Sequence, residues 1–391
     1  MRKVTAKYLA THLVEPRTHL PLESAGDELI SSTGTVPRVN GVPVFSDIEP
    51  SKQWRDELRQ TADFLTAHVA LPNSTAPCAW TIPWLNDTLL NDENRMVCIG
   101  GSFSDDIPHI TRGHKFNVDL FAHIYAEFAS SVMDAQDTTF VSCWAEDLPF
   151  ATESVDFVYS RNALDHFDNP VKATVEIHRI LKPGTTFCLA VYFDSSFVDA
   201  HETEIVDLEF LKKVIEPLFE TISIRFIDAE PTAAVFRNVT TKFLHLVGRK
   251  RSNGRLSISP EAIEQHGRLI TCFKKGLYER ENHRGEMAMK FYRAVLAECP
   301  LLVTDNWRQL HACLDLLAMT NKEALITAGL QMRDAGIASN WAPVADLVFG
   351  RYHLSMNGLP EIERVLVECP GYFNNGQWAA TLAKCAAIGS L

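Results

Sequence analysis

The sequence lacks the cysteine spacings that indicate a metal-bound or disulfide-rich protein. Its nine cysteines are an odd number, and no two of them form a C-x-x-C pair. Neither a zinc ribbon nor a disulfide framework is therefore supported. Most of these cysteines lie in apolar runs, where a thiol behaves as a small hydrophobic side chain. We expect them to pack in the core rather than to bind a metal.

Long apolar runs and an excess of positive charge are missing as well. No segment reaches the about 18 to 20 apolar residues that cross a bilayer, and no apolar stretch of signal-peptide length follows the basic start of the chain. We therefore expect a cytoplasmic protein. A net charge of −12 argues against binding to a nucleic-acid backbone. The basic run at 249–251, with Arg255, is better explained as a solvated linker between domains.

What the sequence does contain is a regular alternation of strand-like and helix-like segments over residues 91–250. The strand-like segments are 96–99, 114–119, 139–142, 156–160, 186–192, 219–226 and 240–248. Strands that alternate with helices are typical of a parallel sheet covered on both faces. We therefore expect an α/β domain here, with a Rossmann-like, doubly wound sheet.

Residues 1–90 and 256–391 have different patterns, so we expect three domains. In the first region, residues 34–45 alternate apolar and polar side chains around Asn40-Gly41, which predicts a β-hairpin. Residues 51–69 are helix-like, and together the two segments suggest a small lid. From residue 259 onward helix follows helix. The segment 293–300 is echoed by 363–370, at twice the period of a tetratricopeptide repeat, and a non-repeating helical bundle is the alternative.

Several short motifs follow one another in a fixed order through the α/β region. They are Ala145-Glu146 with Leu148-Pro149-Phe150, then Asp156-Phe157-Val158, Asp165-His166, and Arg179 with Leu181-Lys182-Pro183-Gly184. This order resembles the second half of a class I S-adenosylmethionine (SAM)-dependent methyltransferase. The resemblance implies that the last two strands form an antiparallel pair and that the cofactor lies at the carboxyl ends of the strands.

The resemblance also implies which residues contact the cofactor. The turn after the first strand, Gly100-Gly101-Ser102, stands where the family has "G-x-G-x-G", and Cys98 replaces the usual acidic residue before it. Asp119 ends the second strand, where an acidic side chain binds the ribose; capping of the next helix is the alternative. Trp144 stands at the position of the family's acidic adenine contact. The expected cofactor-binding residues are Gly100, Gly101, Ser102, Asp119, Trp144, Ala145, Glu146, Ser160 and Asn162.

The loop after the fourth strand carries the expected catalytic group. In related sugar and natural-product O-methyltransferases a histidine here and an aspartate after the fifth strand flank the acceptor hydroxyl, and these positions match His166 and Asp194. Imidazole can accept a proton near neutrality, and Asp165 or Asp168 could orient it. The alternative is that His166 only caps the next helix. His201 and Glu202 could line the acceptor side, and we predict no metal site.

These observations predict a SAM-dependent methyltransferase that methylates a hydroxyl of a small polar acceptor, such as a sugar or a glycan. The helices after about residue 255 are expected to make no contact with the cofactor, and they could bind a protein partner. The competing hypothesis is an inactive methyltransferase-like scaffold, which the altered glycine turn favours and Asp119 opposes. A dinucleotide-dependent dehydrogenase is disfavoured because the first turn is not G-x-G-x-x-G.

Overall fold

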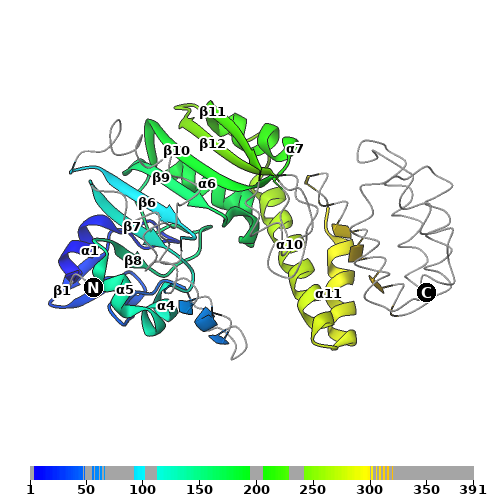
Figure 1. Cartoon of the computed structure of the whole chain (residues 1–391), viewed down its shortest axis with the longest axis horizontal. Coiled ribbons are helices and arrows are strands. Elements are labelled where there is room, and N and C mark those ends of the chain that lie inside the picture. The colour runs from blue at the N-terminus through cyan, green and yellow to red at the C-terminus, as the bar shows by residue number, and fades with distance from the viewer. Residues whose placement is uncertain are drawn as a thin grey trace.

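The structure of the chain is a computed structural model. The structure describes residues 4–46, 48, 92–101, 112–193, 206–228 and 242–299, together with single positions between 55 and 66 and between 301 and 319. Within these residues the largest unit is one seven-stranded sheet, and the other elements pack around it (Figure 1).

The seven strands lie in the order β11-β12-β10-β9-β6-β7-β8. Strands β6 to β10 pair in parallel, whereas β12 is antiparallel to both of its neighbours. The predicted antiparallel pair and doubly wound order are thus confirmed. The bounds of the strands are β6 Arg95–Ile99, β7 His114–Val118, β8 Thr139–Val141, β9 Val155–Arg161, β10 Leu181–Phe193, β11 Phe219–Asp228 and β12 Lys242–Lys250.

The central strands are buried on both faces, as expected for a parallel sheet with helices on each side. Along β6, Val97 and Ile99 belong to the main hydrophobic core, while Met96 and Cys98 belong to a second cluster on the opposite face. The helices that follow the strands are α4 (Ala122–Phe128), α5 (Ser130–Ala135), α6 (Pro170–Ile180) and α7 (Leu208–Phe210), which continues into η3 (Leu211–Ile215) and α8 (Glu216–Leu218).

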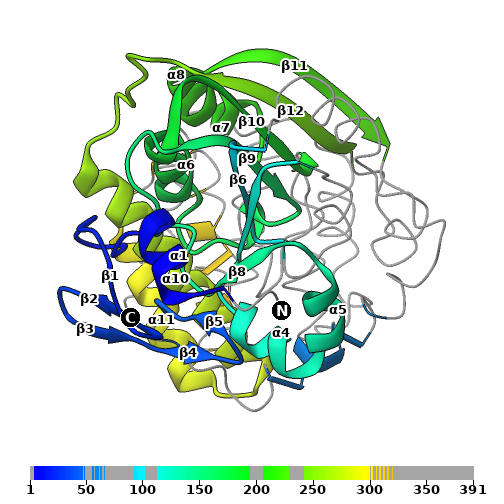
Figure 2. The ribbon, with the colours of Figure 1, turned by 90° about the vertical axis from the view of Figure 1, so that its left-hand side faces the viewer.

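The N-terminal region adds a helix and two small sheets beside β8 (Figure 2). The predicted hairpin exists: β4 (Arg38–Val39) pairs with β5 (Val42–Pro43) across Asn40 and Gly41, whose φ angles are 50° and 81°. Positive φ at both positions defines a type I′ turn, for which Asn-Gly is the preferred pair. Backbone bonds between Ser142 and residues 43 and 45 dock this hairpin against β8. The remaining elements are α1 (Ala6–His12), β1 (Glu23–Ala25), β2 (Glu28–Ser31) and β3 (Gly34–Val36).

The chain after the sheet forms two long helices, α10 (Pro260–Glu281) and α11 (Gly285–Ala297), which pack side by side (Figure 1). Helix α10 also contacts α6, because Asn169, the N-cap of α6, donates from Nδ2 to the carbonyl of Ile263 at 2.8 Å. The segments 330–336 and 363–370, which suggested a helical repeat, lie outside the described residues, as does most of the predicted helix at 51–69. Among the helices that the structure describes, none is long and apolar enough to cross a membrane.

One arginine explains why two of the sequence motifs occur together. Arg179, near the end of α6, donates to the carbonyls of Leu148 (3.0 Å) and Phe150 (2.8 Å), while its guanidinium pairs with Glu176 at 2.7 Å. Glu176 in turn accepts the backbone N–H of Leu148 at 3.0 Å. The Leu148-Pro149-Phe150 loop is therefore held against α6 by a nearly buried ion pair.

We expect Arg179→Met to lower the free energy of unfolding by about 2 to 4 kcal/mol, because it leaves a buried carboxylate and two carbonyls without their donor. Arg249→Met is the control, since the Arg249–Glu220 pair is exposed and such pairs contribute at most about 1 kcal/mol. Urea unfolding of both variants measures the difference. Equal losses would show that the Arg179 contacts do not hold the loop.

Candidate functional site

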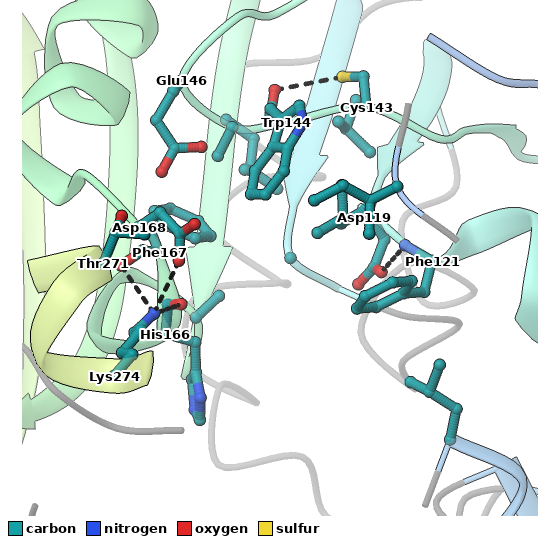
Figure 3. A pocket seen from close by; sticks show the side chains of 18 of the residues that line it. Asp119, Phe121, Cys143, Trp144, Glu146, His166, Phe167, Asp168, Thr271 and Lys274 are labelled. Atoms are coloured by element: carbon teal, nitrogen blue, oxygen red, sulfur yellow. Dashed lines mark hydrogen bonds and ion pairs between the residues drawn. The ribbon is translucent and has the colours of Figure 1, made fainter. Parts of the chain in front are cut away.

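A cavity of about 570 Å³ opens at the carboxyl ends of β6, β7, β8 and β9 (Figure 3). This volume lies in the range of about 300 to 1,000 Å³ that small-molecule sites have. Seven of the predicted site residues line it, namely Gly100, Asp119, Trp144, Ala145, Glu146, Asn162 and His166. Apolar side chains cover much of the remaining wall, among them Phe121, Tyr125 and Phe167.

The turn after β6 brings the backbone close to the loop after β9. Gly100 has a φ of +70°, and a Cβ atom built on it would lie 2.3 Å from the Cβ of Ala163. Only glycine combines this conformation with this separation. Gly101 does not line the cavity: a Cβ there would lie 2.6 Å from the Sγ of the buried Cys98. Cys98 thus fills the space beneath the turn as a small apolar group. Ser102 lies outside the described residues.

Asp119 follows β7 and lies at the wall of the cavity beside Phe121 (Figure 3). Its Oδ1 accepts the backbone N–H of Phe121 at 2.9 Å. The N-cap of α4 is Phe121, so Asp119 stabilises the turn before the helix rather than occupying the cap position. A carboxylate has two oxygens and about four acceptor positions. The bond to Phe121 therefore does not by itself prevent Asp119 from accepting a hydrogen bond from a ligand.

The segment after β8 contributes Trp144, Ala145 and Glu146. The half-buried Trp144 side chain points into the cavity (Figure 3). The carboxyl group of Glu146 is buried and accepts the backbone N–H of Asn169 at 2.8 Å. Burial first, and the nearby charge of Asp168 to a smaller extent, raise the pKa of Glu146 to about 7, although the hydrogen bond from Asn169 opposes them. The Glu146 side chain therefore ties the β8 loop to the start of α6, a role that the sequence did not indicate.

The loop after β9 supplies Asn162 and His166. Asn162 has a φ of 48°, and its N–H donates to the carbonyl of Ala190 at 2.7 Å, which anchors the loop to β10. His166 ends the short helix η2 (Leu164–His166). Its side chain is 35% exposed, and its Nε2 lies 3.9 Å from the buried carboxylate of Asp165. The imidazole is thus accessible from the cavity while an acidic side chain lies close to it.

Some predicted site residues do not contribute to the cavity wall or cannot be placed. Ser160 does not line the cavity: its buried hydroxyl donates to the carbonyl of Ile99 at 3.1 Å and so links β9 to β6. Asp194, His201 and Glu202 lie outside the described residues. Within the part of the chain that the structure describes, no three His, Cys, Asp or Glu side chains are grouped so that they could hold a metal ion.

Helix α10 forms a wall of the cavity that the sequence did not predict. We expected the helices after residue 255 to make no contact with the cofactor, yet Thr271, Lys274, Lys275 and Tyr278 line the cavity. Lys274 donates from Nζ to the carbonyls of His166 (2.6 Å) and Phe167 (3.1 Å) and pairs with Asp168 at 3.2 Å (Figure 3). The only signal in the sequence was the i, i+3, i+4, i+7 spacing of these residues, which a solvated helix face shares.

Comparison with known proteins identifies the central part of the sheet. Residues 97–189 match the family described as "Methyltransferase domain". Over these residues the chain is therefore similar to a methyltransferase domain. The matched residues run from β6 into β10 and include Asp119, Trp144 and His166. S-adenosyl-L-methionine is the cofactor of this domain, in agreement with the class I resemblance of the sequence motifs.

Solved structures of methyltransferases and related proteins are similar at low identity. The YcgJ protein of Bacillus subtilis is 18% identical, with 44% of this chain and 99% of that chain covered and a TM-score of 0.38. A Haloferax volcanii complex of the Trm112 methyltransferase activator with a methyltransferase is 20% identical, with 52% of this chain and 96% of that chain covered and a TM-score of 0.37. Phosphoethanolamine N-methyltransferase 2 of Haemonchus contortus, in complex with SAM, is 14% identical, with 54% of this chain and 62% of that chain covered and a TM-score of 0.39. These values carry no inference about the acceptor. The comparison with curated proteins found no match.

The described residues fit the cofactor. The close approach at Gly100 leaves the backbone of the turn bare of side chains, as the methionine end of SAM requires. Asp119 presents carboxylate oxygens for a ribose diol, and Trp144 presents an aromatic face on which an adenine can stack. The chain departs from the family's pattern at Cys98, which replaces the acidic residue and is buried beneath the turn, and at the glycine positions taken by Ser102 and Ser104, which lie outside the described residues.

Gly100→Ala and Gly184→Ala form a matched pair that tests the turn. Both glycines have a positive φ, +70° and +75°, but a Cβ at Gly184 would meet nothing within 4 Å. We expect Gly184→Ala to cost about 1 to 2 kcal/mol of stability, from the backbone conformation alone. Gly100→Ala should cost more, because of the clash with Ala163, and should weaken the binding of S-adenosylhomocysteine (SAH) at least tenfold. Urea unfolding and calorimetric titration measure the two effects, and identical behaviour of the variants would contradict the role of the turn.

Proposed function

We propose that this protein transfers the methyl group of SAM to a hydroxyl group of a small polar acceptor, such as a sugar, with His166 as the general base. The observation that carries the proposal is that Asp119 and His166, from the ends of different strands, line the same cavity. The first is suited to hold the cofactor and the second to act on the acceptor.

The cofactor would lie along the carboxyl edge of the sheet. The turn at Gly100 would receive its methionine end, the carboxylate of Asp119 its ribose diol, and the segment Trp144 to Glu146 its adenine. Asn162, exposed at the end of β9, is placed to contact the cofactor or the acceptor. We further propose that the chain divides into three domains at about residues 90 and 255. Helix α10 of the third domain completes the wall of the cavity in the second.

When bound, SAM would supply an electrophilic methyl group on its sulfonium; the carbon–sulfur bonding pair would stay on sulfur as the acceptor oxygen bonds to the methyl carbon. The acceptor hydroxyl loses its proton to the imidazole of His166, which passes it to solvent. The carboxylate of Asp165, 3.9 Å from Nε2, stabilises the imidazolium that forms. Alignment of the hydroxyl with the methyl group supplies a further part of the rate enhancement. Asp194 remains a predicted second catalytic group.

Asp119→Asn tests the cofactor site. We expect the intact protein to bind SAM or SAH in the micromolar range, about −8 kcal/mol. The asparagine keeps an oxygen for the N–H of Phe121 but loses the second carboxylate oxygen and the charge. SAH binding should therefore weaken by about 1 to 3 kcal/mol, as calorimetric titration can measure. An unchanged affinity would remove Asp119 from the site.

His166→Ala tests the chemistry. An acceptor is first identified by screening nucleotide sugars and cell-envelope glycans for methyl uptake from labelled SAM. The variant should then turn over about 10² to 10⁴ times more slowly, while its affinity for SAH stays the same. His283→Asn is the control, because His283 is exposed in the turn between α10 and α11. Full activity of His166→Ala would exclude a general base at this position.

The alternative from the sequence, an inactive scaffold, makes the opposite prediction for the same titration. A scaffold that has lost its site binds neither SAM nor SAH. The altered glycine turn was its main support, and in the structure that turn keeps the tight approach at Gly100. The observations therefore favour the enzyme.

A further inference from the structure

The wall of the cavity formed by α10 is polar. Thr271, Lys274, Lys275 and Tyr278 follow the i, i+3, i+4, i+7 spacing and lie along one side of the helix. Its other side is fully buried at His266, Ile270, Phe273 and Leu277. The polar side faces a concave space that also contains His166, so it is placed to contact whatever His166 acts upon.

The two lysines of this wall differ in their contacts. Lys274 is largely buried, and its three bonds to residues 166–168 fix the loop that carries His166. It is a positioning residue. Lys275 is exposed and lines the cavity, and its Nζ lies 5.9 Å from the centre of the ring of Phe291, which is outside the cavity wall. Among the described residues it has no carboxylate within ion-pair distance.

The carboxylates of the cavity have other partners. Asp168 is paired with Lys274, Glu146 accepts the N–H of Asn169, and Asp119 accepts the N–H of Phe121. Lys275 is thus a cation on the wall of a partly apolar cavity. The wall of a cavity screens an ion pair less than open water does, although the exposure of Lys275 limits this gain.

We propose that Lys275, with the hydroxyl of Tyr278 one turn further along α10, binds an anionic substituent of the acceptor. The substituent would be a carboxylate or a phosphate. This inference rests on the proposed function and narrows its substrate class to sugars or similar polyols that carry a negative charge. The residues assigned to the cofactor lie on the sheet side of the cavity, whereas α10 is joined to the His166 loop through Lys274. The acceptor, which His166 must reach, is therefore the ligand next to Lys275.

The test is a calorimetric titration of the full-length protein, with and without saturating SAH, using glucuronate, glucose 1-phosphate and methyl glucoside as probes. The first carries a carboxylate, the second a phosphate and the third no charge. We expect at least one anionic probe to bind at least tenfold more tightly than methyl glucoside. Comparison of the two anions identifies the preferred group. If neither anion binds, or if all three bind equally, the proposal is wrong.

Lys275→Met should weaken binding of the preferred anion at least tenfold, and Lys275→Arg should restore part of it. The matched control is Lys290→Met, an exposed lysine on α11 outside the cavity wall, which should bind the anion as the wild type does. Loss of SAH affinity in Lys275→Met, with anion binding unchanged, would assign Lys275 to the cofactor carboxylate and overturn the proposal. Failure of the wild type to bind SAH, with the anion still bound, would refute the proposed function but not the anion site.

Discussion

The site depends on how tightly the loop after β9 is held from two sides. On one side the loop meets the turn at Gly100, where no side chain fits between the backbone and Ala163. On the other side Lys274 donates to two consecutive carbonyls of the loop and to Asp168. His166 lies between these contacts, so its position is set by both the sheet and α10. A general base is effective only when its geometry is fixed in this way, and the two sets of contacts come from parts of the sequence more than a hundred residues apart.

Much of the fold could be predicted because its signals are local. Buried strands are short apolar runs, and the Asn40-Gly41 pair specifies a hairpin through its backbone preferences alone. The fifth strand is the exception: β10 begins at Leu181, five residues before the predicted start. The Lys182-Pro183-Gly184 segment was expected to be a turn before the strand. It lies instead within β10, where the register with β9 shifts between Leu181 and Thr186. Such an irregularity depends on the neighbouring strand, which the local sequence does not show.

The site was predictable to the extent that it lies at strand ends, since parallel strands bring their carboxyl ends to one edge. Asp119, Trp144 and His166 meet in one cavity for this reason. Ser160 could not be assigned correctly because one residue along a strand reverses the direction of a side chain. The contribution of α10 to the cavity wall could not be predicted from the sequence for a different reason. A polar stripe on a helix has the same sequence pattern whether it faces water or a substrate, and only tertiary packing distinguishes the two.

The place of α10 in the wall of the cavity has a consequence for the order of events during synthesis. A ribosome adds about 5 to 20 residues per second, and the parts of a chain generally fold as they emerge. Strand β11 can join the sheet only after β12 has emerged, because β12 separates β10 from β11. Helix α10 follows β12 directly in the chain. The cavity is therefore completed only after the sheet, and a nascent chain that ends before Lys274 would expose the His166 loop without its restraint. An acceptor that contacts α10 would then stabilise only the finished molecule.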